Sequence, residues 1–154
     1  MEREKKKILV VDDDKAILKS LKLVLEAEGY IVATAETAGE AIVKSKNSYY
    51  DFALLDIRLP DMEGTELLTR MDLGVPRMRV VMITGYPSLE NTIESLNQGA
   101  DGYLIKPIDP TKLLKIIEEK LKEQEAERQE YERKEAILKT KTMLKYYDPV
   151  QSAP

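Results

Sequence analysis

Short apolar runs alternate with amphipathic stretches along about the first 120 residues of the chain. Turn or cap residues bound each run, which is typical of strands that are buried inside a sheet. The runs predict five strands, at Ile8–Val11, Ile31–Ala35, Phe52–Asp56, Arg79–Ile83 and Tyr103–Ile105. The stretches between them predict helices that end near Gly29 and near Asn47, that cover about 65–72, and that lie between Ser88 and Gly99.

Cap residues mark where several of these helices begin. Thr37 and Glu40 have the spacing of a capping box, in which two helix-terminal groups satisfy each other. Asp109 as N-cap, with Pro110 at the first helical position, opens a final helix. No residue breaks this helix until about Lys145, so it would be about 54 Å long at 1.5 Å per residue.

Five strand–helix alternations predict one doubly wound α/β domain, in which a parallel sheet carries helices on both faces. The carboxyl ends of all its strands then share one edge, where such sheets bind their ligands. Polar residues stand at this end of four of the five predicted strands: Asp12 and Asp13, Asp56, Thr84, and Lys106. Each residue alone has an ordinary structural explanation, but their shared position predicts one functional site.

Composition narrows the chemistry that is available to such a site. The chain has no cysteine and no histidine, which excludes disulfides, thiolate catalysis, and the commonest metal ligand and general base. Its formal charge of −4 indicates no nucleic-acid-binding surface. No apolar stretch approaches the roughly 20 residues that cross a bilayer, and the charged amino end has no signal-peptide core. We therefore expect a cytoplasmic protein that binds neither nucleic acid nor membrane.

Three aspartates at one edge of a sheet need a cation. Two carboxylates about 4–5 Å apart repel each other by roughly 3–4 kcal/mol at an effective dielectric constant of about 20. A few oxygen ligands without histidine or cysteine favour Mg²⁺. A metal beside Lys106 and the Thr84 hydroxyl could bind and stabilise the oxygens of a phosphoryl group. Asp56 itself can then be the nucleophile, forming an acyl phosphate.

Four motifs lie at the ends of the predicted strands. They are Asp12-Asp13, Leu-Leu-Asp56-Ile-Arg-Leu-Pro-Asp-Met-Glu-Gly64, Ile-Thr84-Gly, and Gly-Ala-Asp-Gly-Tyr103-Leu-Ile-Lys106-Pro107. Together they resemble the receiver domain of bacterial and archaeal two-component response regulators, over about residues 6–122. The resemblance implies a flavodoxin-like sheet of strand order 2-1-3-4-5. It also implies a signalling domain that receives a phosphoryl group, and not an enzyme in the usual sense.

The resemblance assigns the phosphoacceptor and the metal ligands. Asp56 would accept the phosphoryl group from the phosphohistidine of a partner, either a histidine kinase or a phosphotransfer protein. Asp13 and Asp56, Asp12 through water, and the backbone carbonyl of Arg58 would hold Mg²⁺. Arg58 and Tyr86 would tune the rate at which water removes the phosphoryl group.

The resemblance also assigns a switch. Lys106 and Thr84 would contact the phosphoryl oxygens, and Tyr103 would change its side-chain position as Thr84 moves. Lys106 and Pro107 would be joined by a cis peptide, which costs little before proline. The switch would act on the surface of the fourth helix, the fifth strand and the base of the last helix, framed by Ser88 to Gln98 and Pro110 to Leu121.

Three other classes of protein fit parts of the pattern. Asp12 and Asp14 match the nucleophile and acid of a haloacid-dehalogenase-type phosphatase, but Ala16 stands where those enzymes have Thr or Val, and their late acidic pair is absent. A flavodoxin-type FMN binder shares the architecture, but the three aspartates would repel the phosphate of FMN. The third alternative is a receiver-like module that binds partners without phosphorylation.

The chain is expected to divide into a receiver domain at 1–122 and a helical extension at 123–154. The face of the last helix that packs on the domain would be formed by Leu113, Leu114, Ile117 and Leu121. A heptad register continues beyond it through Gln124, Arg128, Tyr131, Glu135 and Leu138. This register is mostly polar, so it makes a weak coiled coil on its own. The extension has no recognisable effector domain, and we expect a linker or a helix that supports a homodimer upon phosphorylation.

Overall fold

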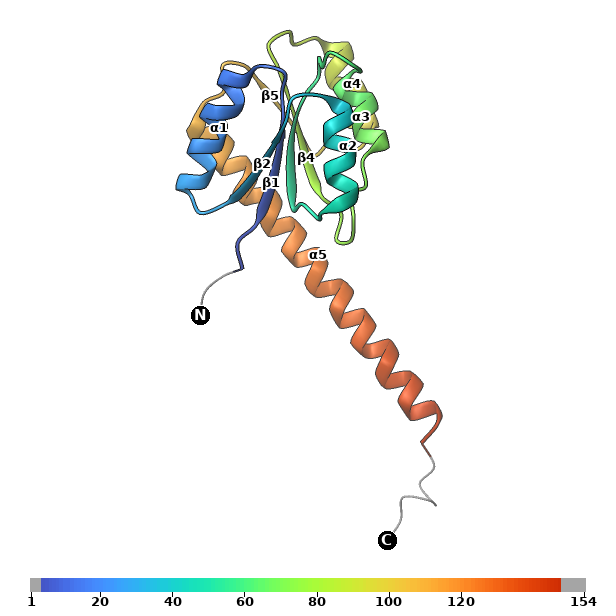
Figure 1. The fold of residues 1–154 in the computed structure, drawn as a ribbon. Helices are drawn as coiled ribbons and strands as arrows, with labels where there is room; N and C mark the ends of the chain where they lie inside the picture. The colour runs from blue at the N-terminus through green and yellow to red at the C-terminus, as the bar shows by residue number, and fades with distance from the viewer. Residues whose placement is uncertain (1–3, 148–154) are drawn as a thin grey trace.

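The structure is a computed structural model that describes residues 4–147, and it has the predicted doubly wound α/β architecture (Figure 1). The parallel strands are β1 (Lys7–Val11), β2 (Ile31–Ala35), β3 (Phe52–Asp56), β4 (Arg79–Thr84) and β5 (Gly102–Ile105). The helices of this described part are α1 (Lys15–Ala27), α2 (Ala38–Asn47), α3 (Gly64–Arg70), α4 (Leu89–Asn97) and α5 (Pro110–Lys145). The strand order is β2-β1-β3-β4-β5, which confirms the predicted order.

The sheet separates two hydrophobic cores, because neighbouring residues of a strand point to opposite faces. In β1, Leu9 and Val11 belong to the core under α2 and α3, whereas Ile8 and Val10 belong to the core under α1 and α5. Figure 1 shows α4 on the same side of the sheet as α2 and α3. Burial on both faces explains why the sequence shows continuous apolar runs and not alternation.

Most predicted helix ends are confirmed by the cap geometry. Thr37 caps α2, and its hydroxyl accepts a hydrogen bond from the Glu40 N–H. In a capping box the Glu40 carboxylate would accept a hydrogen bond from the N–H of Thr37. Here it accepts one from the N–H of Glu36, one residue earlier. Gly29 and Gly99, which follow α1 and α4, have φ angles of 95° and 97°, a region that favours glycine.

One helix is shorter than predicted. The pattern placed the third helix at about 65–72, but α3 ends at Arg70 because Met71 has an extended backbone and a buried side chain. The next residue, Asp72, donates its N–H to the Ser45 hydroxyl of α2 at 3.2 Å. The burial of Met71 and the contact with α2 favour an extended backbone after Arg70. Helical periodicity in the sequence gives no sign of either interaction.

α5 crosses one face of the sheet and then projects far beyond it (Figure 1). Its range is the predicted one, and Leu113, Ile117 and Leu121 are buried on the domain as predicted, while Leu114 is partly buried there. Although α5 is long, no helix among residues 4–147 is both long and apolar enough to cross a bilayer.

α5 is fastened to the amino edge of the sheet past Leu121. The Gln124 side chain is buried, and its amide donates to the backbone carbonyls of Asp51 at 2.8 Å and Arg77 at 3.1 Å. One turn further on, Glu127 forms an ion pair with the buried Arg79. The domain boundary near residue 122 stays a prediction, but these contacts show that α5 touches the domain beyond it.

We expect the substitution Gln124→Ala to lower the free energy of unfolding by about 1–3 kcal/mol, because two carbonyls inside the fold lose their donor. Gln129→Ala is the matched control on the exposed part of the same helix, and it should change this free energy by less than about 0.5 kcal/mol. Urea unfolding followed by circular dichroism measures both. Equal stability of the two variants would show that the Gln124 bonds do not hold α5 to the sheet.

Candidate functional site

The carboxyl ends of β1, β3, β4 and β5 bring the predicted site residues to one edge of the sheet. Asp56 and Thr84 are the last residues of β3 and β4, while Asp12 and Lys106 directly follow β1 and β5. The order of the strands reverses at β1 and β3, which is where doubly wound sheets bind ligands. The predicted convergence of these residues is therefore present in the fold.

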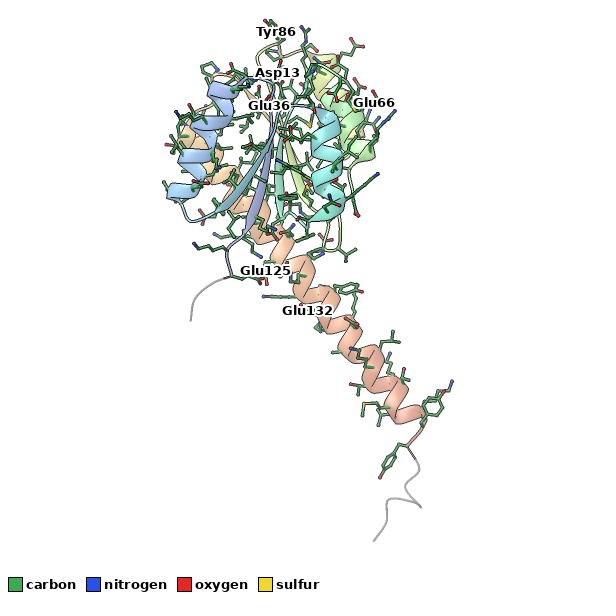
Figure 2. The ribbon with its side chains drawn as sticks, viewed as in Figure 1. Asp13, Glu36, Glu66, Tyr86, Glu125 and Glu132 are labelled. Carbon is green, nitrogen blue, oxygen red and sulfur yellow. The ribbon has the colours of Figure 1, made fainter. Side chains whose placement is uncertain are left out.

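Asp12, Asp13 and Asp56 form an acidic cluster at this edge. One carboxylate oxygen of each lies within 4.8 Å of the others. Asp12 and Asp56 are buried, whereas Asp13 is exposed. Figure 2 shows Asp13 at the end of the domain opposite to the projecting part of α5. The cluster is thus open to solvent through Asp13 and closed behind it.

Lys106, which is joined to Pro107 by the expected cis peptide, partly neutralises the cluster. Its Nζ lies 2.7 Å from Asp12 Oδ2 and donates a hydrogen bond of 3.0 Å to Asp56 Oδ2. Burial lowers the pKa of Lys106, but the ion pair with Asp12 and the hydrogen bond to Asp56 outweigh burial and hold that pKa above its usual value. Lys106 is therefore a fixed positive charge between two buried carboxylates.

The buried position of Asp12 disfavours its ionised form. Burial raises the pKa of Asp12, and the ion pair with Lys106 and the hydrogen bond from the Asp14 N–H offset only part of that rise. The negative charge of Asp56 raises it further. A buried carboxylate with a raised pKa is more stable when a cation lies beside it.

The donor set fits Mg²⁺. Three carboxylates and one ammonium leave a formal charge of −2, which a divalent cation would balance. Backbone N–H groups orient the two buried carboxylates: Asp14 N–H donates to Asp12 Oδ1 at 2.9 Å, and Arg58 N–H donates to Asp56 Oδ1 at 3.2 Å. The further oxygen ligand expected from the Arg58 carbonyl stays a prediction.

Thr84 and Tyr103 lie on the neighbouring strands β4 and β5. Thr84 is buried, and its hydroxyl oxygen accepts a hydrogen bond from the Tyr86 N–H at 3.0 Å, which leaves the hydroxyl proton for another acceptor. The Tyr103 ring packs against the core under α2 and α3, and its buried hydroxyl has no hydrogen-bond partner among the described residues. Their coupled movement stays a prediction.

Asp61 in the loop after β3 and Gly64 at the start of α3 shape the site, and the sequence did not single out either residue. The Asp61 carboxylate accepts hydrogen bonds from the N–H groups of Ala38 and Gly39 at 2.9 and 2.8 Å, and these bonds lower the pKa of Asp61. At Gly64 a Cβ atom would lie 2.1 Å from the Asp56 carbonyl oxygen. Both residues stand in the quoted motif, but local periodicity gives no signal for either contact.

The two predicted tuning residues contact each other. The guanidinium carbon of Arg58 lies 4.6 Å from the centre of the Tyr86 ring, a cation–π contact between two exposed side chains. Figure 2 shows Tyr86 at the same end of the domain as Asp13. The sequence placed Arg58 and Tyr86 two residues beyond Asp56 and Thr84, but it gave no sign that they touch.

Fold and site together define a doubly wound α/β signalling domain with an acidic site at its switch point. The family described as response regulator receiver domain matches residues 8–118, and the chain belongs to this family. Its members are signalling domains and not enzymes in the usual sense. This match confirms the family and the fold class that the motifs predicted.

Solved structures and curated relatives agree with the family. The chain is 56% identical to a CheY-like response regulator receiver domain protein from Methanospirillum hungatei JF-1, with a TM-score of 0.77 over 80% of this chain and 99% of that one. It is 38% identical over 107 residues to the alginate biosynthesis transcriptional regulatory protein AlgB of Pseudomonas syringae pv. tomato. It is 34% identical over 111 residues to the cell cycle response regulator CtrA of Brucella ovis.

The matched segments cover 70% of this chain but 24% of AlgB, and 72% of this chain but 48% of CtrA. The chain thus spans about a quarter to a half of the length of these relatives. What it shares with them is the receiver domain.

We expect Lys106→Met to lower the free energy of unfolding by roughly 3–5 kcal/mol at pH 7 in chelator, because it leaves two buried carboxylates without their ammonium. The loss should shrink as the pH falls toward about 4, because the raised pKa of Asp12 lets the folded state take up the proton first. Urea unfolding at several pH values measures this. Lys112→Met, at an exposed position, is the control, and a loss that is equal at pH 7 and pH 4 would contradict the charge argument.

Proposed function

We propose that Asp56 of this receiver domain accepts a phosphoryl group from the phosphohistidine of a partner histidine kinase or phosphotransfer protein. The observation that carries the proposal is the position of the Asp56 carboxylate, 3.0 Å from the Lys106 ammonium and within 4.8 Å of two further carboxylates. A nucleophile in that setting needs a donor from outside, since the chain has no histidine that could carry the group first.

In the proposed reaction, Asp56 is the one residue of the domain that forms a new covalent bond. An Asp56 oxygen forms a bond to phosphorus while the bond between phosphorus and the donor imidazole nitrogen breaks, and the imidazole keeps the electron pair of that bond. Lys106 would then donate a hydrogen bond to one phosphoryl oxygen, and the Thr84 hydroxyl would donate a hydrogen bond to another. These two residues position the group without themselves changing bonds.

Asp12, Asp13 and Asp56 would hold Mg²⁺, which when bound supplies positive charge against the carboxylates and the phosphoryl oxygens. Asp13 is the exposed ligand and leaves the site open to the donor. Arg58 and Tyr86 would form a cover at the mouth of the site through their cation–π contact and so set how fast water reaches the acyl phosphate.

The output surface would be the face formed by α4, β5 and the base of α5. Leu89, Ile93 and Leu96 recur at helical spacing along α4, and these side chains and Ile105 of β5 are exposed. Tyr103 lies on β5, next to the strand that ends in Thr84. Its buried hydroxyl has no hydrogen-bond partner among residues 4–147, and its side chain would occupy the space that Thr84 leaves. We propose that this face signals to a partner protein or to a second copy when Thr84 moves toward the phosphoryl group.

The family match decides against the phosphatase and the FMN binder that the sequence left open. A receiver-like module that works without phosphorylation has no support from the site, in which acceptor, lysine, threonine and acidic cluster are all present. A histidine-kinase donor and a cytoplasmic location follow from the proposed function and stay predictions.

Acetyl phosphate with Mg²⁺ should add a single phosphoryl group, a mass increase of about 80 Da, to the natural protein. Asp56→Asn should prevent the addition, because an amide is a far poorer nucleophile than a carboxylate. Asp72→Asn, an exposed aspartate away from the site, should retain it. Intact mass and peptide mapping measure the product, and a phosphoryl group on serine or threonine would refute the mechanism.

Mg²⁺ should raise the melting temperature, because it relieves the repulsion within the acidic cluster. With a dissociation constant of about 1 mM, 10 mM metal would add roughly 1.4 kcal/mol, or a few degrees. Asp13→Ala should abolish the response, while Asp72→Ala should preserve it. A melting temperature of the natural protein that is the same in Mg²⁺ and in chelator would overturn the metal site.

A further inference from the structure

The part of α5 beyond Lys122 has two halves of opposite charge. Residues 123–135 contain six acidic and three basic side chains, whereas residues 136–147 contain three lysines and no acidic side chain. Some of these charges are already paired: Glu125 with Lys6 and Glu127 with Arg79 of the domain, and Glu130 with Arg133 and Glu135 with Lys139 within the helix. Within residues 4–147, Glu132 and Lys141 take part in no ion pair, and Figure 2 shows Glu132 on the helix clear of the domain. The helix therefore offers an acidic half and a basic half to a partner.

A stripe along the same part of α5 has the alternating spacing of four and three residues that pairs helices. Its members are Ala126, Glu130, Arg133, Ile137, Thr140 and Leu144. Ile137 is 44% exposed and Leu144 is 66% exposed, so the domain does not cover them. The stripe differs from the register predicted through Gln124 and Arg128, because Gln124 is buried against the sheet of its own domain.

We propose that a second copy of this chain covers the stripe, with the two α5 extensions antiparallel. Leu144 of one copy then lies over the small Ala126 of the other, and Ile137 packs on the aliphatic stem of Arg133. The centre of the pair falls near residue 135, and the basic half of each helix lies along the acidic half of the other. Because the pair is symmetric, each of these contacts occurs twice.

Charge decides the direction of pairing. In a parallel pair in register, Glu130 would face Glu130, Arg133 would face Arg133, and each lysine would lie beside its own copy. In the antiparallel pair, Glu130 of one copy lies across from Thr140 of the other and beside Lys141, which flanks that position. Charges along the stripe therefore repel each other in a parallel pair and attract each other in an antiparallel pair.

The antiparallel pair holds the two receiver domains at opposite ends of the paired helices. It does not use the α4, β5 and α5 face, and it needs no phosphoryl group on Asp56. Only about 20 residues of each helix take part, so the interface is small and the pairing is expected to be weak and concentration-dependent.

Sedimentation equilibrium of the full, unphosphorylated chain tests the pairing. We expect the natural chain to associate reversibly, and both Ile137→Glu and Leu144→Glu to weaken the association by roughly tenfold. Leu138→Glu is the matched control, because Leu138 is 65% exposed but lies off the stripe. These positions are remote from the domain, so the melting temperature should stay unchanged in all three variants. The proposal is overturned if the natural chain is monomeric up to about 1 mM, or if Leu138→Glu weakens the association as much as the other two substitutions.

Disulfide trapping tests the direction, and the natural lack of cysteine gives it a clean background. Under mild oxidation, a mixture of Ala126→Cys and Leu144→Cys chains should give the mixed disulfide dimer. Each variant alone should give little dimer, since the antiparallel arrangement keeps identical positions far apart. Efficient trapping of either variant with itself, without the mixed product, would establish parallel pairing and overturn the antiparallel arrangement.

Discussion

Two buried carboxylates held against one ammonium are the constraint on which this domain depends. Asp12 and Asp56 come from the neighbouring strands β1 and β3, and Lys106 reaches them from the end of β5. Such a group is costly to bury, because the desolvation of its charges is offset only by close pairing. The parallel sheet can hold it because hydrophobic cores on both faces fix the strands, and the strands fix the side chains at their ends. The remaining negative charge is what makes this edge a receptor for a cation and a phosphoryl group.

At the opposite edge of the sheet, several polar and charged groups are paired with each other. There the polar groups satisfy one another: Gln124 donates to the carbonyls of Asp51 and Arg77, and Glu127 pairs with Arg79. An edge with its hydrogen bonds complete resists rearrangement, whereas an edge with surplus charge responds to whatever neutralises it. A change at Asp56 is therefore expected to be absorbed near Thr84, Tyr103 and α4, while the segment of α5 around Gln124 and Glu127 stays fixed.

The strands, their order and the members of the acidic site could be predicted because each depends on local signals. Buried strands read as apolar runs, and the functional side chains stand at the ends of those runs. The contacts that the sequence did not reveal are all non-local. Asp61 binds the start of α2, Arg58 stacks on Tyr86, and Gln124 reaches two carbonyls that are 73 and 47 residues away. Polar side chains of this kind have no periodicity, so only the folded chain shows their partners.

Gln124 shows why a heptad register cannot be assigned from spacing alone. Continuing the buried positions Leu113, Ile117 and Leu121 along the helix leads to Gln124, which the domain itself covers. Beyond the ion pairs of Glu127 with Arg79 and of Arg128 with Asp51, the helix projects away from the sheet, and nothing requires the next contact face to be the same one. Charged pairs such as Glu130 with Lys134 stabilise an isolated helix in water without apolar help. Ile137 and Leu144 are therefore not needed to keep α5 helical, and their exposure costs solubility unless another surface covers them.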